Sequence, residues 1–263
     1  MWNIRNFVRH DNLIINPRTS IFNGGKDNIL RYEFPLMQWL IAQPQIWFGE
    51  SIRFVRISIF LIGVLTLLAF AGIVYELFND FWTAALSSAL LQFSPLFFNY
   101  TINPIPDNLA LCLSCCYLLS ILRYRNSESM STLIVASIFL SLATLCKLPY
   151  ILIGIVSLCF VISDLRRKKI SQLISKFVIP QLLILIPAIA WYLWVIPTWT
   201  GNPILTGQLD EKFVMDDYLK LLDYHRKHMF PNLLLSKPVW LIMILGIYNF
   251  CLLYTSPSPR DRG

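Results

Sequence analysis

The chain has 263 residues, of which 56% are hydrophobic and 14% are charged, and its mean hydropathy is +0.58. Soluble domains carry about 25% charged residues, and their apolar residues alternate with polar ones instead of forming near-continuous runs. This composition excludes a soluble globular domain and predicts an integral membrane protein. The net charge of +7 does not indicate nucleic-acid binding, because the basic residues lie in short loops between apolar runs, where they act as topology signals.

The first 56 residues are predicted to be a loop that carries one short helix. Its start, MWNIRNFVRHDNLIINPRTS, is polar and lacks the apolar core of a secretory signal peptide. The segment Phe34–Gly49 is short, is broken by Pro44 and is flanked by Trp39 and Trp47. Tryptophan gathers at membrane surfaces, so we expect a juxtamembrane helix in the interface rather than a span.

Residues 57–197 are predicted to form a transmembrane helix bundle. Several of its apolar runs are shorter than the roughly 20 residues that cross a bilayer, so helix ends with aromatic belts are expected to make up the difference. A loop follows at 198–237, and residues 238–250 begin a further transmembrane helix. The predicted fold class is therefore all-α and polytopic. The runs lie at residues 57–77, 82–98, 109–122, 132–145, 150–162 and 177–196.

Five of the six cysteines are interpreted as reduced residues that pack helices, because they lie inside apolar runs. The sixth opens the tail CLLYTSPSPRDRG at residues 251–263, which resembles a translated adapter of transposase-based sequencing libraries. We treat this tail as non-native. Because the usual first membrane helix is also missing, we expect the chain to be a fragment of a longer gene. The five cysteines are Cys112, Cys115, Cys116, Cys146 and Cys159.

The basic loops predict the orientation of the bundle. The segment DLRRKKISQLISK at 164–176 holds five basic residues, and Arg123 and Arg125 lie two helices earlier. Cytoplasmic loops are enriched in lysine and arginine, so both loops are placed in the cytoplasm, whereas the loop at 79–80 carries no such signal. Helix alternation then places the candidate chemistry on one side. Four segments are expected on the outer face: residues 1–56, 103–107, the corner at residue 147, and 198–237.

Two ionisable residues at predicted helix ends could carry chemistry. Asp107 follows Pro106 and opens an apolar run. Its carboxylate could cap the helix, or bind a cation, a sugar hydroxyl or an acceptor proton in an outer cavity, and a cap would also fix its position. Lys147 interrupts SLATLCKLPYIL, where it either snorkels to water or binds the phosphate of a lipid substrate.

Further candidates have weaker signals. Glu33 in RYEFPL either caps the following helix or lines the same cavity. Arg53 and Arg56 lie on the predicted outer face, against the positive-inside tendency, and either snorkel or bind an anionic headgroup. His225 and His228 are a weak metal signal and are interpreted as part of a solvated helix. No P-loop, GxGxxG or HExxH motif is present, so no cofactor is firmly implied, and a divalent metal is an unsupported alternative.

Six segments, in this order, resemble the C superfamily of glycosyltransferases. The resemblance is to the branch of dolichyl-phosphate-mannose protein mannosyltransferases and bacterial lipid A aminoarabinose transferases. Each motif alone is weak, and the resemblance rests on their order along most of the chain. The segments are RNFVRHDNLIINPR, RYEFPLMQWLIA, GESIRFVRISIFLIG, FSPLFFNYTINPIPDNLAL, LATLCKLPYIL and LIPAIAWYLWV.

The resemblance implies transfer of a sugar from a polyprenyl-phosphate donor to a lipid, glycan or protein acceptor. The reaction would invert the configuration at the anomeric carbon and take place on the outer face of the bacterial cytoplasmic membrane. By motif matching, Asp107 takes the second outer-loop acidic position, Lys147 a phosphate contact and Glu33 the juxtamembrane acid. The acidic pair that precedes the RNF segment in the family is missing here. We therefore expect the catalytic base upstream of Met1, a supporting role for Asp107, and no activity of this chain alone.

Two other functions share parts of this pattern. A lipid-linked sugar flippase or other transporter would also have many helices, but transporters tend to show internal repeats and charges at the middle of the membrane. No repeat is visible here, and the ionisable residues lie at helix ends, which favours the enzyme. A polysaccharide polymerase or ligase would differ mainly in its acceptor. In each case membrane lipids are expected partners, and nucleic acid is not.

Overall fold

The computed structural model describes residues 2–19, 28–165, 170–199, 215–234 and 244, and the statements below concern these residues. They form helices and one isolated β-bridge, between Arg18 and Ile29, so the described part is all-α as predicted. The helices are α1 (Trp2–Arg9), α2 (Leu36–Phe48), α3 (Ile52–Phe78), α4 (Phe81–Gln92), α5 (Pro95–Ile102), α6 (Pro106–Ser127), α7 (Met130–Cys146), α8 (Ile155–Asp164), α9 (Ile170–Leu173), α10 (Ile179–Val195) and α12 (Met215–Tyr224). Shorter 3-10 or π turns are η1 (Leu148–Gly154), η2 (Ile174–Val178), η3 (Ile196–Trp199) and η4 (His225–Leu234).

The chain divides into two compact units. The first comprises Met1–Ser88 and Tyr100–Glu211, and the second comprises Ala89–Asn99 and Lys212–Gly263. The described part of the second unit contains α12, an exposed helix that carries surface ion pairs such as that between Lys220 and Asp216, four residues apart. The first unit contains α3 and α6 to α10, and therefore most of the predicted bundle.

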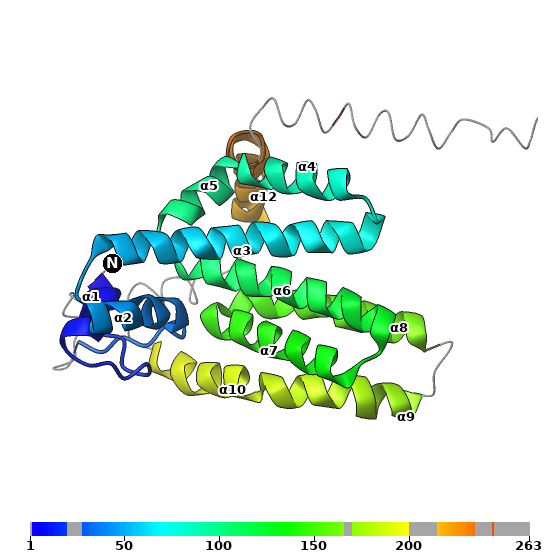
Figure 1. The fold of residues 1–263 in the computed structure, drawn as a ribbon, viewed down its shortest axis with the longest axis horizontal. Helices are drawn as coiled ribbons and strands as arrows, with labels where there is room; N and C mark the ends of the chain where they lie inside the picture. Colours follow the sequence, from blue (N-terminus) through cyan, green and yellow to red (C-terminus); the bar gives the residue numbers. More distant parts are fainter. Residues whose placement is uncertain (1, 20–27, 166–169, 200–214, 235–243, 245–263) are drawn as a thin grey trace, which may run out of the picture. The chain divides into compact units, whose positions relative to one another are not determined.

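The hairpin of α6 and α7 lies at the centre of the first unit (Figure 1), with α3 packed on α6 and α10 packed on α7. The hairpin turns tightly because Glu128 adopts the left-handed conformation, with φ of 51°, and its N–H bonds to the carbonyl of Tyr124. Small residues allow close packing of the helices. A Cβ atom on Gly72 of α3 would lie 2.9 Å from a methyl carbon of Leu119 on α6.

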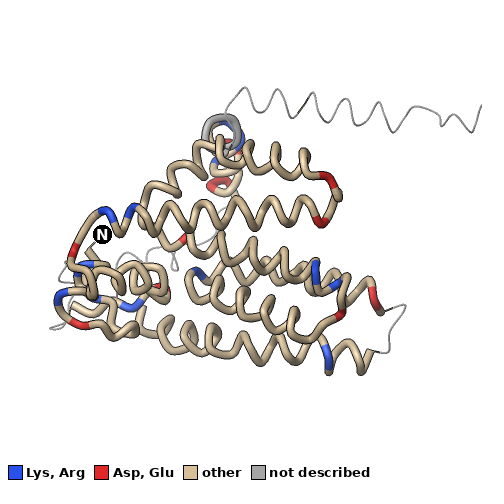
Figure 2. The backbone as a smooth tube through the Cα atoms, viewed as in Figure 1, with Lys and Arg blue, Asp and Glu red and all other residues tan. Residues whose placement is uncertain are grey.

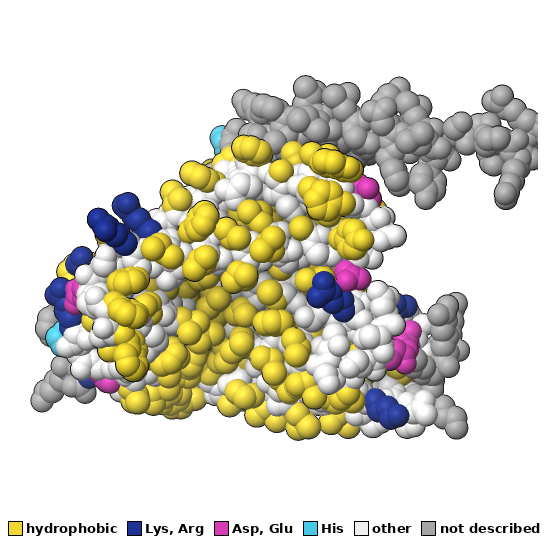
Figure 3. Space-filling model, in the orientation of Figure 1, with side chains coloured by type: hydrophobic (Ala, Val, Ile, Leu, Met, Phe, Trp, Pro, Cys, Tyr) yellow, Lys and Arg dark blue, Asp and Glu magenta, His cyan; other side chains and the backbone are white. Residues whose placement is uncertain are grey.

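In the described part of the chain, two helices are long and apolar enough to cross a membrane, at Ile52–Phe78 and Ile170–Trp199. Residues 130–146 and 148–164 form shorter apolar helices, and α4 and α5 together qualify as one span only with a bend of 70° between them. Hydrophobic side chains cover much of the visible face (Figure 3), while charged residues gather near helix ends (Figure 2). These features confirm the predicted all-α polytopic membrane fold, and the apolar run predicted at 82–98 is divided between α4 and α5.

The predicted break at Pro44 is wrong, because α2 continues through it to Phe48. An interior proline removes one backbone hydrogen bond and costs about 3 kcal/mol. Packing offsets this cost, since α2 buries Met37 and Ile41 against its neighbours in the core of the first unit. Trp47 and Phe48 at its end are 79% and 77% exposed, which is compatible with an interfacial position.

Candidate functional site

Three of the predicted site residues come together at one end of the α6–α7 hairpin. Asp107 lies in the first turn of α6, and Lys147 follows the last residue of α7. Because the two helices run antiparallel, the start of one and the end of the other lie side by side. Glu33 comes from the loop before α2. We call these three residues the Lys147 cluster.

The Lys147 ammonium is the centre of the cluster. Its Nζ donates a hydrogen bond of 2.6 Å to Oδ1 of Asp107 and lies 3.9 Å from Oε1 of Glu33. The Asp107 side chain is 15% exposed, whereas those of Lys147 and Glu33 are 32% and 36% exposed. The pair is therefore held away from bulk water but stays open on one side. With all three groups ionised, the cluster carries a net charge of −1.

Burial and charge act in opposite directions on the groups of the cluster. Burial raises the pKa of Glu33 above its ordinary value of 4.5, although the charge of Lys147 lowers it. For Lys147, burial lowers the pKa, but the hydrogen bond to Asp107 and the charges of Glu33 and Asp107 leave the pKa raised. The ammonium thus stays charged at neutral pH, and Glu33 takes up a proton more readily than an exposed glutamate does.

The loop that carries Glu33 is fixed by contacts to two helices. The backbone N–H of Phe34 donates to the carbonyl of Leu145 on α7 at 3.2 Å, and the hydroxyl of Tyr192 on α10 donates to the same carbonyl at 3.1 Å. The indole N–H of Trp199 donates to the carbonyl of Arg31 at 3.0 Å. The position of Glu33 near Lys147 is therefore set by the bundle rather than by the loop alone.

The capping interpretations of Asp107 and Glu33 are wrong. The N-cap of α6 is Ile105, with Pro106 at the first helical position, and no side chain caps this end. A proline suits that position because its missing N–H would have no partner there. Asp107 is already helical, so its carboxylate is directed to Lys147 instead. The N-cap of α2 is Pro35, so Glu33 does not cap that helix either.

Arg53 and Arg56 are not part of the Lys147 cluster. Both are exposed in the first turns of α3, which Ser51 caps by accepting a hydrogen bond of 3.2 Å from the N–H of Arg53. No ion pair of either arginine occurs among the described residues. Cations at the positive end of a helix dipole are unfavourable. These two side chains are therefore available to an anion from outside the described residues.

The metal interpretation of His225 and His228 receives no support from the described residues. Among these, no group of three or more His, Cys, Asp or Glu side chains is arranged to hold a metal ion. His225 bonds the carbonyl of Leu221, and His228 packs on the ring of Tyr224, as expected for a solvated helix. Residues 200–214 and 235–237 of the predicted outer segment lie outside the described residues, as do the tail 251–263 and most of 238–250.

Some residues near the cluster were missed by sequence reasoning. A small cavity of about 110 Å³ borders Glu33 and is also lined by Gln38 and Asn3. Oε1 of Gln38 is buried and has no hydrogen-bond partner in the described part of the chain. The only signal in the sequence is a glutamine within the apolar run LMQWLIA, where a polar side chain needs a partner.

Buried polar residues also link three helices of the bundle. The hydroxyl groups of Tyr117 and Ser157 lie 2.5 Å apart, and Ser157 donates to Oε1 of Gln181 at 2.9 Å. These residues come from α6, α8 and α10. The five cysteines inside the apolar runs are free thiols as predicted, and four of them are buried or partly buried while Cys159 is exposed.

The first unit is thus a bundle of apolar helices with a charged cluster at one end of its central hairpin, which defines an integral membrane protein. Residues 33–194 match the family described as dolichyl-phosphate-mannose-protein mannosyltransferase, and this match includes the whole Lys147 cluster. The chain belongs to this family, and it is a membrane glycosyltransferase of the C-superfamily type that uses a polyprenyl-phosphate-linked sugar. No curated protein and no solved structure matches the chain.

Proposed function

We propose that the protein transfers a sugar from a polyprenyl-phosphate donor to a lipid, glycan or protein acceptor, with the Lys147 cluster in contact with the donor. The observation that carries this proposal is the partly exposed ammonium of Lys147, held by Asp107 at 2.6 Å within the segment that matches the family. We place the cluster on the outer face of the bacterial cytoplasmic membrane. Support for this orientation comes from the five basic residues of the segment 164–176, because its described residues Asp164 and Lys176 lie with Arg125 at the end of the α6–α7 hairpin away from Lys147.

Lys147 is proposed to bind the donor phosphate. An ammonium group has three N–H donors, of which Asp107 takes one, while Glu33 at 3.9 Å is beyond hydrogen-bond distance. Two donors therefore stay available to a ligand. When the sugar leaves, negative charge builds up on the phosphate, and a fixed ammonium stabilises that charge more than it stabilises the intact donor.

Asp107 is proposed as a supporting carboxylate that holds Lys147 in position. Its Oδ1 already accepts the short hydrogen bond from the ammonium, which makes it a poor base for an acceptor hydroxyl. The base is then a different acidic residue, as the family resemblance implies. Within the cluster, a second anionic role falls to Glu33, which is closer to solvent and borders the small cavity.

The net charge of the cluster bears on the protonation state of Glu33. Two carboxylates and one ammonium give a net charge of −1, which opposes a phosphate. Burial already raises the pKa of Glu33, and an incoming phosphate would raise it further. We therefore propose that Glu33 takes up a proton when the donor binds, so that the cluster becomes neutral.

Arg53 and Arg56 are proposed to contact anionic headgroups at the membrane surface rather than the reacting atoms. They are exposed, lie at the start of a long apolar helix and are separate from the Lys147 cluster. Attraction between a basic side chain and an anionic membrane surface contributes about 1 kcal/mol per residue. Their replacement is expected to weaken donor capture without removing transfer.

The proposal is tested by sugar transfer in membranes from cells that express the complete gene containing this sequence. Asp107→Asn and Lys147→Ala should each lower the transfer of radiolabelled sugar from a polyprenyl-phosphate donor at least 100-fold, with normal membrane insertion. Glu76→Gln is a matched control, because Glu76 forms an ion pair of 3.0 Å with Arg123 at the other end of the bundle. Wild-type transfer by both cluster variants would refute the site assignment.

A transporter of lipid-linked sugars is the alternative, and the orientation can be tested on its own. Cysteines introduced as Pro104→Cys and Ser129→Cys lie at opposite ends of α6 and should be labelled by a membrane-impermeant reagent from opposite sides. Labelling of residue 104 only from the cytoplasm would overturn the proposed outer site. Movement of the donor across vesicles without sugar transfer would favour the transporter.

A further inference from the structure

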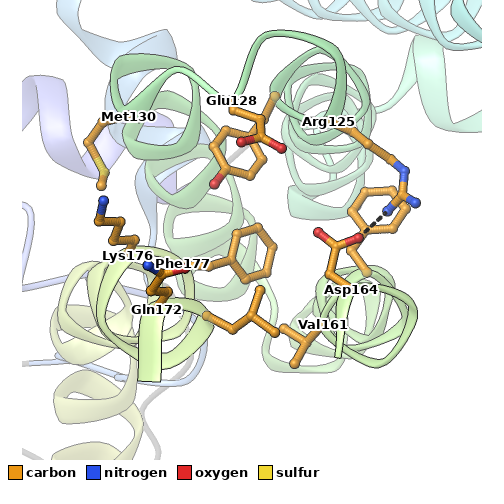
Figure 4. A pocket seen from close by; sticks show the side chains of 11 residues that line it. Arg125, Glu128, Met130, Val161, Asp164, Gln172, Lys176 and Phe177 are labelled. Atoms are coloured by element: carbon orange, nitrogen blue, oxygen red, sulfur yellow. Dashed lines mark ion pairs between the residues drawn. The ribbon is translucent and has the colours of Figure 1, made fainter. Parts of the chain in front are cut away.

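A second polar cavity lies at the other end of the α6–α7 hairpin from the Lys147 cluster. It has a volume of about 290 Å³ and opens between the ends of α6 and α8, the start of α7, and the turn η2 (Figure 4). Because α6 has 22 residues, this cavity is about 30 Å from Asp107. It is therefore separate from the proposed catalytic site and needs its own explanation.

One basic side chain of the cavity is held in place. The Arg125 guanidinium lies 4.7 Å from the ring centre of Phe160 and donates a hydrogen bond of 3.1 Å to Ser163. It is also 3.9 Å from a carboxylate oxygen of Asp164, which is an ion pair but too long for a hydrogen bond. Figure 4 shows Arg125 and Asp164 together on one side of the cavity. This charge is fixed in direction, and only part of its hydrogen-bonding capacity is used.

Lys176 is the second basic side chain, and Figure 4 shows it on the side of the cavity away from Arg125. It is exposed and makes no ion pair with the residues that the structure describes. Lys176 lies in the π-helical turn Ile174–Val178, where the next residue, Phe177, is buried against Tyr124 with ring centres 5.4 Å apart. Single π turns inside helices occur frequently at functional sites. This turn places an ammonium at the rim and an aromatic ring on the wall.

The surroundings of the cavity favour a lipid. It lies at the ends of apolar helices, which is the depth of phospholipid headgroups. Next to its walls, Leu158 and Ile162 of α8 are 57% and 66% exposed, and Ile174 of η2 is 46% exposed. An acyl chain could lie along these side chains while its headgroup enters the cavity. The cavity is also lined by the carboxylates of Glu128 and Asp164, so its basic groups are balanced in number by acidic ones. Arg125 and Lys176 are the lining groups that can bind a phosphate, as basic residues between membrane helices do for headgroups.

We infer that this cavity binds the phosphodiester headgroup of a membrane phospholipid, with Lys176 and Arg125 contacting the phosphate from opposite sides. The inference does not depend on the orientation of the protein, since both leaflets contain phosphodiesters. It does not depend on the proposed function either, because the cavity shares no residue with the Lys147 cluster. The competing interpretation is that Lys176 only snorkels into water.

The test uses the full chain purified in mild detergent, with retained lipid measured by native mass spectrometry. Phosphatidylglycerol is the probe, and diacylglycerol with the same chains is its phosphate-free control. We expect phosphatidylglycerol to be retained and Lys176→Gln to weaken its binding about fivefold, the factor equivalent to about 1 kcal/mol per lysine near a headgroup. Lys176→Arg should restore most of the affinity. Lys220→Gln, which changes an exposed lysine of α12, should have no effect.

Three results would overturn the inference. The first is equal retention of diacylglycerol and phosphatidylglycerol, which would show that the phosphate is not recognised. The second is unchanged binding in Lys176→Gln, as expected for a lysine that only reaches water. The third is displacement of the lipid by millimolar inorganic phosphate, which would make free phosphate the ligand. Asp107→Asn should leave lipid retention unchanged, so failure of the proposed function would be seen separately.

Discussion

Lys147 and Asp107 should be energetically coupled through their hydrogen bond, so that substitutions of the two residues do not have additive effects on stability. Lys147→Met removes the ammonium and leaves the Asp107 carboxylate, only 15% exposed, without its partner. Asp107→Asn keeps an oxygen that can accept the hydrogen bond, and the lysine can still turn toward Glu33, which is 3.9 Å away. The loss of Lys147 should therefore cost more than the loss of the Asp107 charge.

The distances set the size of the effect. A hydrogen bond to a charged group contributes about 1.5–3 kcal/mol, and an unsatisfied buried carboxylate adds to the cost of losing it. Partial exposure of Lys147 keeps the total cost below the sum of these two contributions. We expect the free energy of unfolding to fall by about 2.5 kcal/mol in Lys147→Met, by about 1.5 kcal/mol in Asp107→Asn and by about 2.5 kcal/mol in the double variant. The coupling free energy is then about 1.5 kcal/mol.

The assay can use the buried thiols of the protein itself. Cys112, Cys115 and Cys146 are at most 6% exposed, so the rise in labelling by a thiol-reactive fluorophore above the signal of the exposed Cys159 reports unfolding as the detergent is changed gradually from mild to denaturing. Lys220→Met is the matched control, because that lysine is exposed and its ion pairs should contribute nothing measurable. If the costs of Lys147→Met and Asp107→Asn simply add in the double variant, the two groups are not coupled and the geometric argument fails.

Three further predictions concern other parts of the first unit. Glu33→Gln should be more stable than wild type at neutral pH, because burial raises the pKa of Glu33 and disfavours its ionised form. The difference in the free energy of unfolding should vanish as the pH falls below 4.5, and its persistence there would contradict this explanation. Tyr117→Phe should cost about 1 kcal/mol in the thiol assay through loss of the hydrogen bond to Ser157, whereas Tyr75→Phe, with an exposed side chain, should cost less. Gly72→Val should cost about 1–3 kcal/mol, because the new side chain meets Leu119 on α6, and an unchanged stability would mean that α3 and α6 are not closely packed.

The helices could be predicted from the sequence because each is an apolar run between polar loops. The runs at 109–122 and 132–145 lie within α6 and α7, and the adjoining loops contain the charges that orient them. The errors at Pro44 and Asp107 have local causes. Pro44 does not break α2 because packing offsets the lost hydrogen bond, and Asp107 does not cap α6 because Pro106 already occupies the first helical position.

The candidate site was predictable in its members but not in its geometry. Residue type and helix-end position were enough to single out Asp107, Lys147 and Glu33. Their mutual distances depend on the antiparallel pairing of α6 with α7, and on the contacts that hold the Glu33 loop to α10. Gln38 and the pair Tyr117–Ser157 gave no usable signal, because isolated polar residues in apolar runs have many possible partners.

The sequence by itself determined that this is an integral membrane protein. Insertion of a segment into a bilayer depends on its length and hydrophobicity, and both can be obtained from the sequence without the positions of neighbouring helices. It also determined which residues carry charge at the ends of the helices. Only the tertiary structure decided that Lys147 bonds Asp107 at 2.6 Å, that Arg53 and Arg56 lie apart from this pair, and that Lys176 borders a second cavity. Such pairings join residues 40 or more positions apart, and only the packing of whole helices sets those distances.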